Sequence, residues 1–136
     1  MYKGRPKKRR EELATSLYER LGGADGIASL VDDIVEAHMQ NPVIQPRFLP
    51  YRADPGRLAE VKKHLRGFLG AGSGGPDAYS GRSMPDAHRG MNINEAEYMA
   101  ALDDILQTLD KHGVDEATRN EVLGIAYSLK GEIMRV

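Results

Sequence analysis

The 136-residue sequence contains no cysteine, no tryptophan and only two phenylalanines. The absence of cysteine excludes disulfides, thiol nucleophiles and cysteine-ligated zinc or iron–sulfur sites. The apolar runs are far shorter than a membrane span, and no signal-peptide apolar region follows the basic N-terminus. The net charge of −1 gives no overall field that would recruit nucleic acid. We therefore expect one soluble, cytoplasmic domain with no nucleic-acid or membrane partner, long enough to bury a core.

The first residues of the chain are polar and include a basic run from Lys3 to Arg10. Such a run could contact nucleic acid or an anionic membrane surface. This one is short, lacks interleaved aromatic residues and is followed at once by acidic residues. The sequence therefore predicts a mobile basic tail over residues 1–15 and a folded domain over residues 16–136.

Apolar residues recur through most of the chain at the spacing of amphipathic helices, and no segment alternates as a strand does. The pattern predicts an all-α fold. A proline-interrupted connector from Pro42 to Pro55 and a glycine-rich stretch from Gly74 to Met91 separate the helical segments. We expect helices over Ser16–Leu21, Asp25–Gln40, Pro55–Leu69, Asn94–His112 and Asp115–Met134.

Two of these helices begin with the pattern of a capping box, in which a glutamate follows the N-cap residue by three positions. The pairs are Ser16 with Glu19 and Asn94 with Glu97. The second helix has an apolar stripe at i, i+3, i+4, i+7 and i+8. This stripe consists of Ile27, Leu30, Val31, Ile34 and Val35. The last helix has a predicted inner face of Val122, Ile125, Ala126, Leu129 and Ile133.

The glycine-rich stretch contains a short predicted helical turn carrying Met84, Ala87, His88 and Met91. A histidine held on such a turn, with methionine neighbours and glycines at both ends, is well placed to ligate a metal. A flexible surface loop with an ordinary histidine is the alternative interpretation of the stretch.

The four histidines have different sequence contexts. His112 fits a helix C-terminus, and His38, at the end of a core-facing stripe, fits a partly buried, hydrogen-bonded side chain. His64 and His88 could face each other across an apolar slot if the glycine-rich stretch folds back under the third helix. Neutral imidazole ligates iron well, so such a slot suits haem. Its walls would be Val35, Phe48, Val61, Leu65, Phe68, Met84 and Met91.

The sequence resembles the group I truncated haemoglobins. The resemblance rests on LYERLGG at Leu17–Gly23, Gly74-Gly75-Pro76 with Tyr79, Gly81–Met84, and Ala87-His88. It extends from about Ser16 to Ile133. It implies a two-over-two helical sandwich with helices A, B, E, a short F, G and H, which binds haem b.

The resemblance also implies roles for single residues. His88 matches the family's proximal iron ligand, and Phe48 matches the phenylalanine that packs on the haem. Arg82 is a candidate partner for a haem propionate. The other pocket residues implied by the family are Val35, Val61, Leu65, Phe68, Leu69, Tyr79, Met84, Met91 and Ile93.

The distal side departs from the usual pattern of the family. Many members have a tyrosine and a glutamine that hydrogen-bond bound dioxygen, where this sequence has Val35 and Leu65. His64 occupies a position that supplies a sixth iron ligand in some members, and an apolar pocket favours that role because no other strong donor is near. The alternatives for His64 are a propionate partner or a swinging hydrogen-bond donor. Lys62 and Lys63 are poorer ligands, since a lysine of pKa about 10.4 must first lose its proton.

Three functions follow as hypotheses. The first is a hexacoordinate haem protein, ligated by His88 and His64, that handles O₂, NO or electrons with a reductase partner. The second is a pentacoordinate O₂ carrier or gas sensor, and the third is an interaction module without a cofactor. Nitric oxide dioxygenation occurs in the family. The resemblance gives less support for this activity in the present chain, because Val35 and Leu65 replace the polar distal pair. We expect a monomer or weak oligomer.

Overall fold

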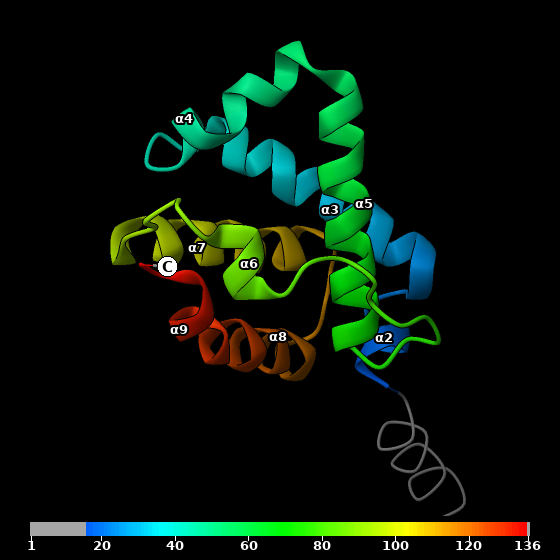
Figure 1. Cartoon of the computed structure of the whole chain (residues 1–136). Helices are drawn as coiled ribbons and strands as arrows, with labels where there is room; N and C mark the ends of the chain where they lie inside the picture. Colours follow the sequence, from blue (N-terminus) through cyan, green and yellow to red (C-terminus); the bar gives the residue numbers. More distant parts are fainter. Residues whose placement is uncertain (1–15, 136) are drawn as a thin grey trace, which may run out of the picture.

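Helices make up nearly all the regular structure of the chain (Figure 1). The computed structural model describes residues 16–135, so the predicted basic tail and Val136 lie outside the described residues. Within the described range the only β-type pairing is an isolated bridge between Ile93 and Met134. The predicted all-α fold is confirmed. No helix in this range has both the length and the apolar character needed to cross a membrane.

The helices follow the predicted order with three differences. The third predicted helix continues to Gly72, the connector contains two short helices, and the last predicted helix breaks at Leu129. The connector helices each begin with proline in the first turn, where its fixed φ favours a helix. The elements are α2 (Leu17–Arg20), α3 (Gly23–Gln40), α4 (Gln45–Phe48), the 3₁₀ helix η1 (Leu49–Ala53), α5 (Pro55–Gly72), α6 (Met84–His88), α7 (Glu95–Lys111), α8 (Glu116–Ser128) and α9 (Lys130–Ile133).

The long helices form two packed pairs. Helix α3 packs on α5, α7 packs on α8, and α3 also packs on α7, which joins the pairs. In Figure 1 α7 and α8 run across the direction of α5. This arrangement is the predicted two-over-two sandwich. The short α6 packs on α9.

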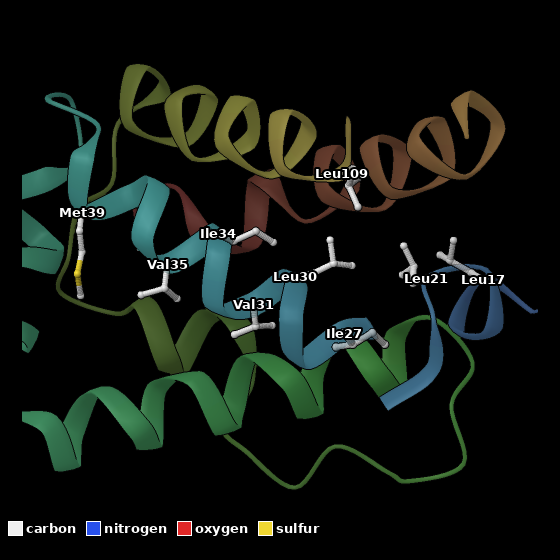
Figure 2. Packing of buried hydrophobic residues seen from close by; sticks show 9 residues of the cluster. All are labelled: Leu17, Leu21, Ile27, Leu30, Val31, Ile34, Val35, Met39 and Leu109. Carbon is white, nitrogen blue, oxygen red and sulfur yellow. The ribbon is translucent and has the colours of Figure 1, made fainter. Parts of the chain in front are cut away.

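The core is centred on α3, whose predicted apolar stripe is buried along its whole length (Figure 2). Met39 extends this stripe by one turn. Gly26 allows the close approach of the chain before α3, because a Cβ at Gly26 would overlap the carbonyl oxygen of Leu21. The cluster contains Leu17, Leu21, Ile27, Leu30, Val31, Ile34, Val35, Met39 and Leu109.

The predicted helix caps are present. The Ser16 hydroxyl accepts a hydrogen bond from the Glu19 amide at 3.1 Å. At the start of α7, the Asn94 side chain accepts from the Glu97 amide at 2.8 Å, and the Glu97 carboxylate accepts from the Asn94 amide at 3.2 Å. The second pair is a complete capping box, which fixes where α7 begins.

The prediction for the inner face of the last helix is wrong at Ile125, which is 40% exposed. Ile125 lies inside α8, before the helix ends, on a side that the other described helices only partly cover. The predicted helix also does not run straight to Met134, because the chain leaves α8 at Leu129, whose amide is shared between the carbonyls of Ile125 and Ala126. Such sharing is common at helix ends.

Candidate functional site

His88 is the last residue of α6 and is half-buried. Ser83 caps this helix by accepting a hydrogen bond from the Asp86 amide at 3.3 Å, and Pro85 lies in its first turn. The His88 Nδ1 atom lies 2.8 Å from the Met84 carbonyl oxygen. A carbonyl can only accept, so Nδ1 carries a proton, and in the neutral ring Nε2 then has the lone pair needed to bind a metal.

The glycine-rich stretch before α6 has a defined fold built around Tyr79. The Tyr79 hydroxyl donates to the Arg82 carbonyl at 2.8 Å, and its ring meets Phe68 of α5 edge to face, with centroids 5.2 Å apart. A Cβ at Gly81 would overlap the Tyr79 ring and hydroxyl, so a side chain there would force Tyr79 out of this position. The structure therefore brings Tyr79, Phe68 and Arg82 together as one group.

Helix α5 has two different apolar faces. Leu58, Leu65 and Leu69 pack against the core cluster centred on α3. Val61 and Phe68 are half-buried but are not among the side chains packed on that cluster. No residue of α5 is fully buried, although the helix has five large apolar side chains. The Val61–Phe68 face is therefore incompletely covered.

His64 lies on the Val61–Phe68 face, since residues at i, i+3 and i+7 line one side of a helix. Its side chain is 52% exposed, and its Nε2 atom is 4.0 Å from the Glu60 carboxylate, too far for a hydrogen bond. Lys62 points elsewhere, because its Nζ atom pairs with Asp32 of α3 at 3.2 Å. Among residues 16–135 no hydrogen bond or ion pair joins His64 to His88.

Phe48, the last residue of α4, lies against a buried polar group. Its ring centroid is 4.9 Å from that of His38, whose Nδ1 atom is 2.7 Å from the Asp104 carboxylate. Asn41 donates to both oxygens of the same carboxylate, at 3.1 and 3.2 Å. Burial lowers the pKa of His38, and the hydrogen bond to Asp104 opposes this shift. His38 is buried and hydrogen-bonded as the sequence predicts.

His112 caps the C-terminal end of α7, as its position in the sequence predicts. Its Nε2 atom lies 2.6 Å from the Asp33 carboxylate of α3.

The remaining predicted pocket residues differ in their surroundings. Val35 is 1% exposed and belongs to the core cluster. Ile93 is buried beside the C-terminal end of the described chain, where its carbonyl accepts from the Arg135 amide at 3.1 Å. Met84 is half-buried, whereas Arg82 and Met91 are exposed.

A haem group fits this set of residues. Haem is held by a neutral imidazole with a free lone pair and by an apolar face not used by the protein core, and a cation at its edge can pair with a propionate. His88 supplies the first, Val61 and Phe68 the second, and Arg82 is available as the third.

A cavity of about 270 Å³ lies elsewhere, between α2, the start of α3 and the end of α5. Its lining contains none of the predicted site residues. This cavity is therefore not the candidate site. Its walls include Tyr18, Ile27, Ala28, Gly67, Gly70 and Pro76.

Sequence reasoning missed Arg47 of α4, which contacts both Glu97 and the Met91 carbonyl. No periodic pattern could have found it, because the residue lies in a proline-interrupted segment and its partners are more than forty positions away.

Comparison with known proteins agrees with the fold. The model of the bacterial-like globin family matches residues 16–135. A group 1 truncated haemoglobin of a Synechocystis species is 34% identical over 116 residues, which cover 82% of this chain and 90% of the relative. The chain belongs to the bacterial-like globins, and its cofactor is haem b. Its relatives place it with the group 1 truncated haemoglobins, so the interaction module without a cofactor does not fit.

Solved structures show the same fold. The truncated haemoglobin of Tetrahymena pyriformis, in a mutant Fe(III) form, aligns with a TM-score of 0.81 at 24% identity, covering 90% of this chain and all of that one. The 2/2 haemoglobin of a Synechococcus species, in the cyanomet state with covalently attached haem, aligns with a TM-score of 0.78 at 25% identity. That alignment covers 88% of this chain and 98% of the Synechococcus chain.

Proposed function

We propose that this globin holds haem b through His88, that His64 is the second axial ligand, and that the protein handles diatomic gases or electrons. The observation that carries the proposal is the 2.8 Å contact from His88 Nδ1 to the Met84 carbonyl. It selects the tautomer that presents Nε2 as a ligand and holds the ring in one orientation.

The chain supplies further contacts for the cofactor. The incompletely covered Val61–Phe68 face of α5 and the ring of Phe48 would pack against its apolar surface, and the Tyr79 ring contacts Phe68 edge to face. Arg82 is exposed just before α6, where it would pair with a propionate. Leu65, Leu69, Met84, Met91 and Ile93 stay predicted pocket residues.

His64 carries the one imidazole of α5. Val35 and Leu65 have no polar group, so neither can hold a gas or a water molecule in competition with imidazole. If His64 ligates the iron, it must leave before a gas can bind. The apparent gas affinity would then be the intrinsic affinity multiplied by the fraction of molecules in which His64 has left. We therefore expect weak gas storage.

Haem iron supplies a binding position for diatomic gases and a one-electron redox couple. His88 and His64 as paired imidazoles favour electron exchange with a reductase, or reaction with nitric oxide once His64 moves. The chain lacks the polar distal pair that would assist nitric oxide dioxygenation, because it has Val35 and Leu65 at those positions. The cytoplasmic location and the monomeric or weakly oligomeric state stay predictions from the sequence.

A second candidate is a pentacoordinate O₂ carrier or gas sensor. The observation that favours it is the position of His64, half-exposed and 4.0 Å from the Glu60 carboxylate. A small rotation would pair the two side chains and leave the distal face open. His64 would then act as a hydrogen-bond donor or a propionate partner.

The absorption spectrum of the haem-loaded ferric protein separates these candidates. His64→Ala should convert a low-spin spectrum to a high-spin one while the haem stays bound, because only one axial ligand is lost. His88→Ala should instead weaken haem retention. His112→Ala is the matched control and should change neither, since His112 pairs with Asp33 at the end of α7. A spectrum unchanged by His64→Ala would contradict hexacoordination by His64.

A further inference from the structure

Arg47 joins three segments that lie far apart in the sequence. Its guanidinium donates to both oxygens of Glu97 at the start of α7, through Nε and, at 3.1 Å, through Nη2. Nη2 also donates to the Met91 carbonyl at 2.8 Å. A planar guanidinium suits this task, because it offers several donors in a fixed fork.

The Arg47–Glu97 pair is better shielded than the other arginine pair in the same region. The two side chains are 28% and 14% exposed, compared with 50% and 49% for Arg52 and Glu36. The Glu97 carboxylate raises the pKa of Arg47, and Arg47 lowers the pKa of Glu97. Both groups therefore stay charged, and the capping box holds Glu97 in place.

The contact with Met91 connects Arg47 to the turn after His88. The Met91 amide donates to the His88 carbonyl at 3.0 Å, and the Met91 carbonyl accepts from Arg47. One peptide turn thus separates the histidine from the guanidinium. On its own side Arg47 precedes Phe48 directly in α4.

We propose that Arg47 is a positioning residue for His88. Its fork fixes the turn from His88 to Met91 against α7 and ties that turn to the helix carrying Phe48, so that the two sides of the haem site keep one spacing. The Met84 contact orients the imidazole from within α6, and Arg47 restrains the same helix from its C-terminal side. This inference rests on the proposed role of His88 as the iron ligand.

The first test needs no cofactor. In the haem-free protein, Arg47→Met should speed amide hydrogen exchange across residues 89–94, since the turn loses its anchor. Arg52→Met is the matched control, because it removes an exposed arginine pair from the adjacent η1 without touching this turn. Arg47→Lys keeps the charge but not the fork, and should also speed the exchange. Exchange at the wild-type rate in Arg47→Met or Arg47→Lys would contradict the proposal.

The second test uses the haem-loaded protein. Arg47→Met should lose haem to an acceptor protein about tenfold faster than wild type, because removing one partner of a shielded charge pair leaves the other uncompensated. In a His64→Ala background, the ferrous iron–histidine stretching band should shift or broaden, which a purely structural defect elsewhere would not cause. Arg52→Met should leave both readouts unchanged.

The two proposals fail separately. If His88→Ala leaves haem retention unchanged, the assignment of His88 as ligand is wrong. If His88 is the ligand but Arg47→Met leaves haem loss and the stretching band at their wild-type values, the positioning role of Arg47 is wrong.

Discussion

The Nδ1 atom of His38 on α3 lies 2.7 Å from a carboxylate oxygen of Asp104 on α7, and both residues are buried. The contact bridges the two helix pairs of the sandwich next to Phe48. Asn41 adds two further hydrogen bonds to the same carboxylate.

Replacing Asp104 should therefore destabilise the protein. Asp104→Ala leaves the buried His38 and Asn41 without their acceptor, and hydrogen bonds to a charged group are each worth about 1.5–3 kcal/mol. We expect the free energy of unfolding, measured by urea denaturation, to fall by about 2–3 kcal/mol. Asp103→Ala, at the exposed neighbouring position, should change it by less than about 0.5 kcal/mol. Equal effects of the two substitutions would contradict the bridging role.

Acid should weaken the same region. Burial lowers the pKa of His38 in the folded state, whereas the unfolded chain has the ordinary value of about 6.5. Below that pH the unfolded state binds more protons than the folded one, so stability falls as the pH is lowered. The midpoint of urea unfolding of the haem-free protein, measured from about pH 8 to about pH 5, reports this loss, because the range spans the ordinary histidine pKa of about 6.5. His38→Gln should reduce the dependence of the urea midpoint on pH. His112→Gln serves as the control, because the His112 side chain is more exposed than that of His38.

Two glycines should respond to alanine in opposite directions. Gly26→Ala should destabilise by about 1–3 kcal/mol, because its Cβ would overlap the Leu21 carbonyl where the chain turns into α3. Gly124, inside α8, has open space around the position of a Cβ. Gly124→Ala should stabilise by about 0.5–1 kcal/mol, since alanine is the better helix former. Thermal unfolding of both variants measures the difference, and the same sign in both would contradict the packing described here.

The sequence predicted the long helices well because their apolar residues follow the helical period. The stripe on α3 is an example, since all five predicted residues are buried. The connector was predicted as irregular because its prolines were interpreted as breaks. In the structure Pro46 and Pro50 lie in first turns, where proline is favourable.

The polar contacts around the site were beyond sequence reasoning. His38 and Asp104 are 66 positions apart, and Arg47 and Glu97 are 50 apart. Such pairs depend on how helices pack, which no local pattern encodes. By contrast, the short helical turn that carries His88 was predicted from the local sequence, and Ser83 and Pro85 at its start are the local signals that fix it.

The central claim is that two imidazoles, from His88 and His64, hold the haem iron. The most direct measurement is the electron paramagnetic resonance spectrum of the ferric, haem-loaded wild-type protein at neutral pH. The account predicts a low-spin signal typical of two axial imidazoles. A high-spin signal as the main species would contradict it and leave His88 as the only protein ligand.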